Sequence, residues 1–166
     1  MVHHDVFIVI PAYNEASRLG PVLEVLRREY RNVVVVDDGS TDATAAVARE
    51  AGCIVLRHAI NRGQGAALQT AITYSLEAGA KFIVTFDADG QHQASDLPGL
   101  LAPVLDGQVD VAIGSRFLAN TAHVPPLRRF LLRMARLFTW MVSGVYLTDC
   151  HNGFRALSRH GAEHRA

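Results

Sequence analysis

The segment VVVVDDGSTD, residues 33–42, joins a run of four valines to two consecutive aspartates and a turn. A continuous β-branched run is typical of a central strand that is buried on both faces of a parallel sheet. Residues Asp37–Ser40 predict a turn after this strand, and Ser40 or Thr41 is expected to cap the helix that comes next. The segment therefore predicts a strand–turn–helix unit of an α/β fold.

The same alternation of elements runs along the rest of the chain. Short apolar runs predict strands at Val6–Ile10, Val33–Val36, Cys53–Leu56, Phe82–Phe86 and Val109–Ile113. Apolar residues at three- and four-residue spacing predict helices at Ala16–Tyr30, Thr41–Ala51, Gln64–Ala78 and Ser95–Leu105. Strand–helix alternation of this period predicts an α/β fold with a mostly parallel central sheet and helices on both faces.

The composition is that of one soluble globular domain. The chain has 166 residues, of which 49% are hydrophobic and 19% charged, enough for a sizeable core. Lys and Arg total 16, as do Asp and Glu, so the overall charge gives no sign of nucleic-acid binding. Cys53 and Cys150 lack a metal-ligand spacing, so two reduced thiols in a cytoplasmic protein are expected.

No export signal or membrane span is visible in the sequence. The first apolar run, Val6–Ile10, is too short for the core of a signal peptide. No uninterrupted apolar stretch approaches the roughly 20 residues that span a bilayer. We therefore expect a cytoplasmic protein, and attachment to a membrane surface stays open.

Polar residues come after several of the predicted strands, at the edge where ligands bind in parallel sheets. Ligands of such sheets lie outside the carboxyl ends of the strands. The side chains expected at this edge are Glu15, Asp37, Asp38, Asp87, Asp89, Gln91 and Arg116. This concentration of acids suits a bound divalent cation.

The segment DADGQH, residues 87–92, carries the strongest candidate for a metal site. Asp87, Asp89 and Gln91 offer oxygen ligands at a strand end, which suit Mg²⁺ or Mn²⁺ better than zinc. A solvated loop is the alternative, because an isolated DxD is common. The two acids of DDGSTD are open to two interpretations as well: turn formation, or hydrogen bonds to a nucleobase or ribose.

Two further segments carry weaker signals. NRGQGAAL, residues 61–68, is a glycine-rich helix entry that could approach a phosphate or a sugar, but it lacks the third glycine of a dinucleotide fingerprint. Residues 127–147 are strongly apolar and place Arg129, Arg133 and Arg136 on one helical stripe. This pattern is typical of an interfacial helix on anionic lipid, and a core-packing helix is the alternative.

Six motifs in order together resemble a known family. They are IPAYNE, VVVDDGSTD, NRGQGAAL, DADGQH, GSR and TDCHNGFRALSR, and they cover residues 6–159. This series resembles the family 2 inverting glycosyltransferases of GT-A fold, particularly the dolichyl- or polyprenyl-phosphate mannose or glucose synthase branch. The resemblance implies one domain, 1–166, with a donor-binding part at about 6–116 and an acceptor- and membrane-facing part at about 117–159.

The resemblance implies a role for each matching residue. Pro11, Tyr13, Glu15 and Asp38 would hold the nucleoside of a sugar nucleotide, and Asp87 would lie near the ribose and diphosphate. The metal, Mg²⁺ or Mn²⁺, would be coordinated by Asp89 and Gln91, with Asp87 close by. The phosphate groups of donor or acceptor would be faced by Arg116, Arg129 and Arg155.

The chemistry of glycosyl transfer agrees with this assignment. Negative charge develops on the departing diphosphate, and a metal with arginines supplies the compensating field. A lipid phosphate acceptor is already anionic and needs no strong base, whereas a neutral hydroxyl would need one, for which Asp149 is the candidate. His92 and His151 are expected to be structural or exposed. The expected partners are a nucleotide sugar, a polyprenyl-phosphate lipid and the cytoplasmic face of a membrane.

The chain departs from the resembling family at its C-terminus, which is short. Only residues 160–166 come after the last motif. A C-terminal segment too short to cover the apolar surface would leave that surface exposed, which would favour dimerisation or membrane attachment. Two alternatives to the transferase stay open. One is a catalytically idle nucleotide-sugar-binding module that a partner completes. The other is a phosphotransferase or phosphatase with Asp87 as nucleophile and Asp89 as acid and base, although that motif is expected on a first strand.

Overall fold

The computed structural model describes residues 4–87, 93–114 and 153–164. The chain divides into two compact units, one formed by Met1–Ala112 with Phe154–Ala166 and the other by Ile113–Gly153. The first unit contains nearly all of the described residues. Among the predicted site residues, Asp89, Gln91, Arg116, Arg129 and Asp149 lie outside the described residues, as does the predicted interfacial segment 127–147.

A six-stranded sheet with the order β3-β2-β1-β4-β6-β5 forms the centre of the fold. The strands are β1 Val6–Ala12, β2 Asn32–Asp37, β3 Ile54–Arg57, β4 Phe82–Thr85, β5 Val111–Ile113 and β6 Arg155–Ser158. β1 pairs in parallel with β2 and β4, and β2 pairs in parallel with β3, whereas β6 runs antiparallel to β4. The expected mostly parallel sheet is thus confirmed, with an antiparallel strand that the sequence pattern did not predict.

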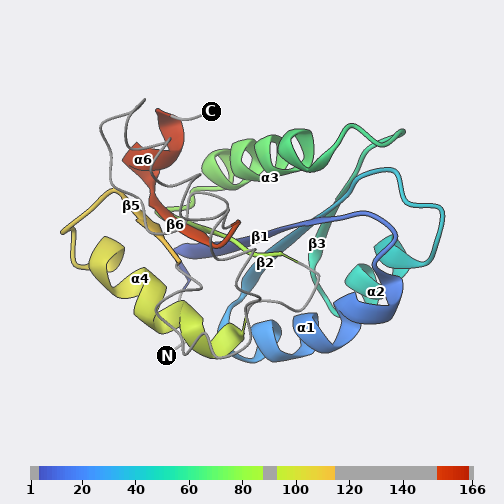
Figure 1. Ribbon diagram of the computed structural model, residues 1–166, viewed down its shortest axis with the longest axis horizontal. Helices are drawn as coiled ribbons and strands as arrows, with labels where there is room; N and C mark the ends of the chain where they lie inside the picture. The colour runs from blue at the N-terminus through green and yellow to red at the C-terminus, as the bar shows by residue number, and fades with distance from the viewer. Residues whose placement is uncertain (1–3, 88–92, 115–152, 165–166) are drawn as a thin grey trace, which may run out of the picture. The chain divides into compact units, whose positions relative to one another are not determined.

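Helices cover both faces of this sheet, as expected (Figure 1). They are α1 Ala16–Glu29, α2 Thr44–Glu50, α3 Gln64–Glu77, α4 Leu97–Leu105 and α6 Arg159–Glu163, with a short 3-10 helix η1 at Ala94–Asp96. α1 and α4 contribute leucines to one apolar cluster, while α3 and α6 contribute alanines to the cluster on the opposite face. Figure 1 accordingly shows α3 and α6 on one side of the strands and α1 and α4 on the other.

The central strands supply alternate side chains to the two clusters. In β1, Ile8 and Ile10 belong to the α1 and α4 side, whereas Val9 points to the α3 and α6 side. All four valines of 33–36 are fully buried, two in each cluster, which confirms a central strand buried on both faces. The continuous apolar run is therefore explained by packing on both faces.

The start of α2 differs from the prediction. The helix begins at Thr44 and not at Thr41, and its N-cap residue is Ala43, so neither Ser40 nor Thr41 caps it. The hydroxyl of Ser40 instead accepts a hydrogen bond from Asn14 N at 2.9 Å. The cap prediction was wrong because the hydroxyls of Ser40 and Thr41 bind Asn14 of the neighbouring loop, whereas Asp42 Oδ1 accepts the hydrogen bond from Thr44 N at 2.9 Å.

The C-terminal segment docks against the sheet through specific contacts. The ring of Phe154 packs edge to face on Phe86 with centroids 5.7 Å apart. Ser158 N donates to Asp110 O at 2.8 Å, and Gly161 comes so close that a Cβ built on it would lie 2.6 Å from the same oxygen. These contacts help to fix β6 in the sheet, and its pairing with β4 brings Arg155 to the edge at which β4 ends.

Candidate functional site

A pocket of about 410 Å³ opens at the carboxyl ends of the parallel strands. Its walls come from the ends of β1, β2 and β4 and from the start of α3, the edge where ligands of parallel sheets bind. The lining residues are Pro11, Ala12, Tyr13, Glu15, Asp38, Asn61, Gly63, Gln64, Ala67 and Asp87. Five predicted site residues, Pro11, Tyr13, Glu15, Asp38 and Asp87, are therefore gathered around one cavity.

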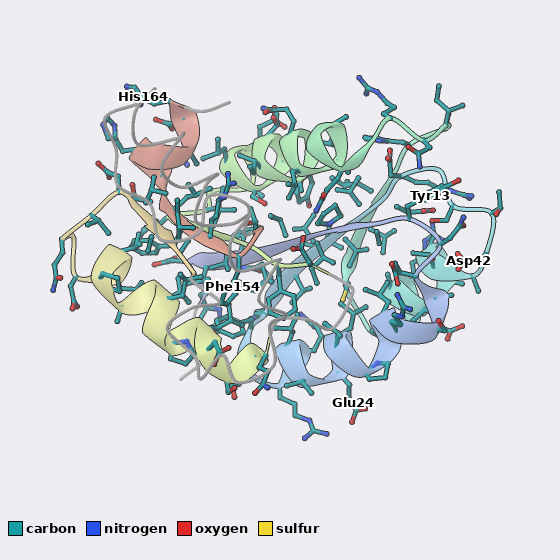
Figure 2. All side chains as sticks on the ribbon, viewed as in Figure 1. Tyr13, Glu24, Asp42, Phe154 and His164 are labelled. Carbon is teal, nitrogen blue, oxygen red and sulfur yellow. The ribbon has the colours of Figure 1, made fainter. Side chains whose placement is uncertain are left out.

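The loop after β1 is tied to the loop after β2 by side chain-to-backbone hydrogen bonds. Asn14 adopts a left-handed conformation with φ of 53°, which asparagine tolerates better than most residues. Its Oδ1 accepts a hydrogen bond from Thr41 N at 2.9 Å, and the hydroxyl of Thr44 accepts one from Glu15 N at 2.9 Å. Figure 2 shows Tyr13 and Asp42, one from each loop, at the same end of the sheet. These hydrogen bonds thus join the two segments into one rim.

Asp37 stabilises the turn after β2. Its carboxylate is fully buried, and its Oδ1 accepts a hydrogen bond from Ser40 N at 2.9 Å. Its Oδ2 lies 3.0 Å from the Nε of Arg57 at the end of β3, and the same guanidinium donates to Ser40 O at 3.1 Å. The first acid of DDGSTD therefore has a structural role, in agreement with the turn interpretation.

Asp38 holds the loop that leads into α3. Its Oδ1 accepts a hydrogen bond from Arg62 N at 2.9 Å and its Oδ2 accepts one from Gly63 N at 2.7 Å. The Nδ1 atom of His58 lies 2.6 Å from the same Oδ1. Burial raises the pKa of Asp38, but these hydrogen bonds outweigh it and bring the pKa below the ordinary value. Asp38 is thus ionised and largely occupied by the protein itself.

Asp87 faces the start of α3 across the pocket. Its Oδ1 accepts a hydrogen bond from Gln64 Nε2 at 3.0 Å, so the loop after β4 is joined to the glycine-rich helix entry. The weak signal of NRGQGAAL thus marks a wall of the site: Asn61, Gly63 and Gln64 all line the cavity. The structure does not make this segment a dinucleotide fingerprint, because it comes after a loop and not directly after a strand.

Arg155 begins β6 and is paired in register with Thr85, near the end of β4. Its backbone N donates to the hydroxyl of Thr85 at 3.2 Å, and it is absent from the pocket lining. Its predicted role toward phosphate stays a prediction.

The charged side chains that line the pocket, within the described residues, are all carboxylates: Glu15, Asp38 and Asp87. Arg18 lies 3.6 Å from Glu15, and His58 faces Asp38 from behind the wall. Asp87 is an oxygen donor at the cavity surface and fits a hard cation such as Mg²⁺ or Mn²⁺. No group of three His, Cys, Asp or Glu side chains in the described ranges could hold a metal, and the predicted ligands Asp89 and Gln91 lie outside those ranges.

Several residues of the site were missed by sequence reasoning. His58, Asn14, Thr44 and Gln64 each bond to another loop of the rim. Asn14 and Gln64 lie within the quoted motifs IPAYNE and NRGQGAAL, but the bonding partner of each of the four residues is at least 20 positions away in the chain and is identified only by pairing in space. Within the described part of the chain, no helix is long and apolar enough to cross a membrane.

Comparisons with known proteins agree with this arrangement. The sequence model of Glycosyl transferase family 2 matches residues 7–165. An uncharacterised protein of Methanocaldococcus jannaschii is 41% identical over 96% of this chain and 67% of its own length. The UDP-N-acetylglucosamine–dolichyl-phosphate N-acetylglucosaminyltransferase of Methanococcus voltae is 31% identical over 93% of this chain and 69% of its own length. The polyprenol monophosphomannose synthase of Mycolicibacterium smegmatis is 34% identical over 92% of this chain and 61% of its own length.

Solved structures share the fold. Glucosyl-3-phosphoglycerate synthase of Mycobacterium tuberculosis, crystallised with Mn²⁺, UDP-glucose and phosphoglyceric acid, superposes with a TM-score of 0.73 at 20% identity. The match covers 95% of this chain and 57% of that one, so this chain spans little more than half of the solved enzyme. A likeness at this identity supports the GT-A α/β fold. From the family match and the relatives that the chain covers to two thirds of their length we conclude that the chain belongs to glycosyl transferase family 2.

Proposed function

We propose that this chain transfers a sugar, with inversion, from a UDP- or GDP-sugar to a polyprenyl or dolichyl phosphate with the help of a divalent metal. The observation that carries the proposal is the pocket at the carboxyl ends of β1, β2 and β4, lined by residues of four of the motifs that resemble this family. The named relatives from Methanococcus voltae and Mycolicibacterium smegmatis act on dolichyl phosphate or make a polyprenol phosphosugar, which supports the acceptor class.

The pocket suits the nucleoside end of such a donor. Tyr13 is 46% exposed at the rim and offers an aromatic face for a base, and the Oδ2 atom of Asp38 keeps one acceptor position for a base or ribose donor. Backbone near Gly63 allows close approach, because nothing lies within 4 Å of a Cβ built there. Pro11 and Glu15 complete this part of the wall.

The diphosphate would lie toward Asp87, where a cation can offset the acidic wall. We propose that Asp87, Asp89 and Gln91 hold Mg²⁺ or Mn²⁺, which would supply positive charge to the departing diphosphate. Supporting this, the fold neighbour from Mycobacterium tuberculosis was crystallised with Mn²⁺ and UDP-glucose. Arg116, Arg129 and Arg155 are proposed to face phosphate groups of donor or acceptor.

The reaction that fits is a single displacement. An oxygen of the acceptor phosphate attacks the anomeric carbon, the bond from that carbon to the diphosphate oxygen breaks, and the configuration inverts. The acceptor oxygen is anionic, so no proton must be removed from it, and Asp149 is needed as a base only for a neutral hydroxyl. A lipid-borne acceptor would place the chain at a membrane surface, and we propose that residues 127–147 bind to that surface. Apolar surface left exposed on the chain is proposed to favour dimerisation as well.

A transfer assay with the full chain tests this function. The chain is mixed with labelled UDP- or GDP-sugar, polyprenyl phosphate and Mn²⁺, and label in the organic phase is counted. We expect lipid-linked sugar in the presence of metal. The variant Asp87→Asn should lose on the order of 10²-fold in rate, because it removes a carboxylate proposed to hold the metal, and with it positive charge at the departing diphosphate, while side-chain shape is kept.

The exposed Asp106, which is the C-cap residue of α4 and lies outside the pocket lining, provides a matched control as Asp106→Asn. It should transfer like the unaltered chain, and both variants should keep the same unfolding midpoint. Metal-dependent nucleotide binding without transfer to any lipid phosphate would overturn the transferase proposal and select the idle binding module. Transfer unchanged in Asp87→Asn would contradict the metal assignment.

A further inference from the structure

His58 is a buried histidine that neither the motifs nor the proposed reaction uses. It comes directly after β3, and only 9% of its side chain is exposed. Its ring lies between two partners: Nδ1 is 2.6 Å from Asp38 Oδ1, and Nε2 is 3.0 Å from the hydroxyl oxygen of Thr70 on α3. The ring therefore connects the end of β2 to the first half of α3, directly behind the pocket wall.

The partners determine which ring atoms carry protons. The hydroxyl of Thr70 donates its single proton to Ala66 O at 2.9 Å, so toward His58 its oxygen can only accept. The ionised carboxylate of Asp38 also only accepts. Both ring nitrogens then face acceptors, an arrangement that is satisfied by an imidazolium ring paired with Asp38.

This ion pair is linked to the loop that forms one wall of the pocket. Asp38 accepts the backbone N–H groups of Arg62 and Gly63, and the flanking residues Asn61 and Gln64 line the cavity. An uncompensated carboxylate so deeply buried would tend to leave this position for water. The cation of His58 removes that cost and so keeps the loop in its binding conformation.

The charge also matters for the ligand. A nucleotide diphosphate is an anion, and the charged pocket-lining side chains of the described residues are carboxylates. His58 neutralises one of them from behind, without occupying space in the cavity. Because the donor's nucleotide is bound throughout the reaction, this effect should act equally on the ground state and the transition state.

We propose that His58 is a positioning residue for nucleotide binding, which holds the Asn61–Gly63 wall of the pocket through a buried ion pair with Asp38. The inference rests on the proposed nucleotide-sugar function for its ligand. It differs from the role first expected for Asp38, because most of that carboxylate's hydrogen bonds serve the loop and not the ligand.

Two substitutions separate the contact from the charge. His58→Asn places an amide N–H where Nδ1 stands and keeps the hydrogen bond to Asp38 without the charge. His58→Gln reaches toward Thr70 instead and loses the bond to Asp38. We expect His58→Gln to raise the Kd for UDP or GDP with Mn²⁺ on the order of tenfold, with His58→Asn between it and the unaltered chain.

Two readouts distinguish positioning from general destabilisation. In the transfer assay, His58→Gln should raise the KM for the nucleotide sugar and leave kcat nearly unchanged. Amide hydrogen exchange at Arg62 and Gly63 should become faster in His58→Gln and recover in His58→Asn. The exposed His160 on α6 gives the control His160→Asn, which should change none of these values.

An unchanged Kd and unchanged exchange at Arg62 and Gly63 in His58→Gln would overturn the inference. If the unaltered chain binds neither UDP nor GDP with Mn²⁺, the proposed function fails, and amide exchange alone then decides whether His58 holds the loop. A loss of affinity that His58→Asn does not partly restore, with normal exchange, would also contradict positioning through Asp38.

Discussion

Gly39 offers a sharp test of how the loops around the pocket are packed. It comes after the two aspartates at the end of β2 and has a positive φ of 74°, a conformation that residues with a Cβ rarely adopt. A Cβ at this position would lie 2.6 Å from both Asn61 N and Ile60 C, which are backbone atoms of the loop that enters α3. We predict that Gly39→Ala strains its own turn and also pushes that loop away.

The size of the effect is the sum of two separate costs. A left-handed conformation costs a residue with a Cβ about 1–2 kcal/mol relative to glycine. Overlap with packed neighbours costs a further 1–3 kcal/mol, roughly, since backbone atoms cannot move aside as a flexible side chain can. The free energy of unfolding should therefore fall by about 2–5 kcal/mol in Gly39→Ala.

Gly79, which lies just beyond α3, provides a matched control. It has a positive φ of 89°, and nothing lies within 4 Å of a Cβ built on it, so Gly79→Ala carries only the conformational cost. Urea unfolding of both variants measures the difference, which should be about 1–3 kcal/mol. Equal losses in the two variants would refute the tight packing of Gly39 on the Ile60–Asn61 backbone, as would unchanged nucleotide affinity in Gly39→Ala.

Two further predictions concern the core and the acid response. Phe154→Ala should lower the free energy of unfolding by about 3–5 kcal/mol in urea titrations, because it removes the buried ring that packs on Phe86; a loss below 1 kcal/mol, roughly, would mean that β6 is not docked. Because the pKa of Asp38 is lower in the folded chain than in the unfolded chain, its ionised form stabilises the fold above about pH 4, the pKa in the unfolded chain. This stabilisation is lost as the pH falls through the pKa in the folded chain. The stability difference between the unaltered chain and Asp38→Asn should therefore shrink on acidification, and a constant difference from pH 7 to pH 3 would contradict it.

The parallel part of the sheet could be predicted from the sequence because its strands are buried on both faces. Val33–Val36 form a continuous apolar run, and such a run has few other interpretations when turn residues come after it. β6 was missed because Arg155–Ser158 has four residues, of which only Ala156 and Leu157 are buried, so neither a run nor an alternation stands out. Its pairing with β4 joins residues 70 or more positions apart, which no local pattern reports.

The location of the site was predictable from the sequence, but its hydrogen-bond network was not. The rule that ligands lie at the carboxyl ends of strands gathered Glu15, Asp38 and Asp87 correctly around one pocket. The hydrogen-bond partners of each carboxylate were not predictable, because they depend on which N–H groups of other loops lie within hydrogen-bond distance. Asp37 and Asp38 are neighbours in sequence, yet one is bonded to its own turn and the other to the loop at Arg62 and Gly63.

This division has a physical origin in the position of the loops. Backbone N–H groups in the loops after the strands have no partner strand to accept their hydrogen bonds. Once a ligand is bound, water cannot be relied on to accept the hydrogen bonds of those N–H groups that line the pocket. Short acidic and hydroxyl side chains solve this by accepting those N–H groups, as Asp38 does for Gly63 and Ser40 does for Asn14. A motif residue beside a nucleotide site can thus be required for activity because it holds the pocket wall in place. A loss of activity on its substitution therefore does not by itself show that the residue contacts the ligand. The amide exchange of Gly63 separates the two roles, because only a wall-building carboxylate protects it.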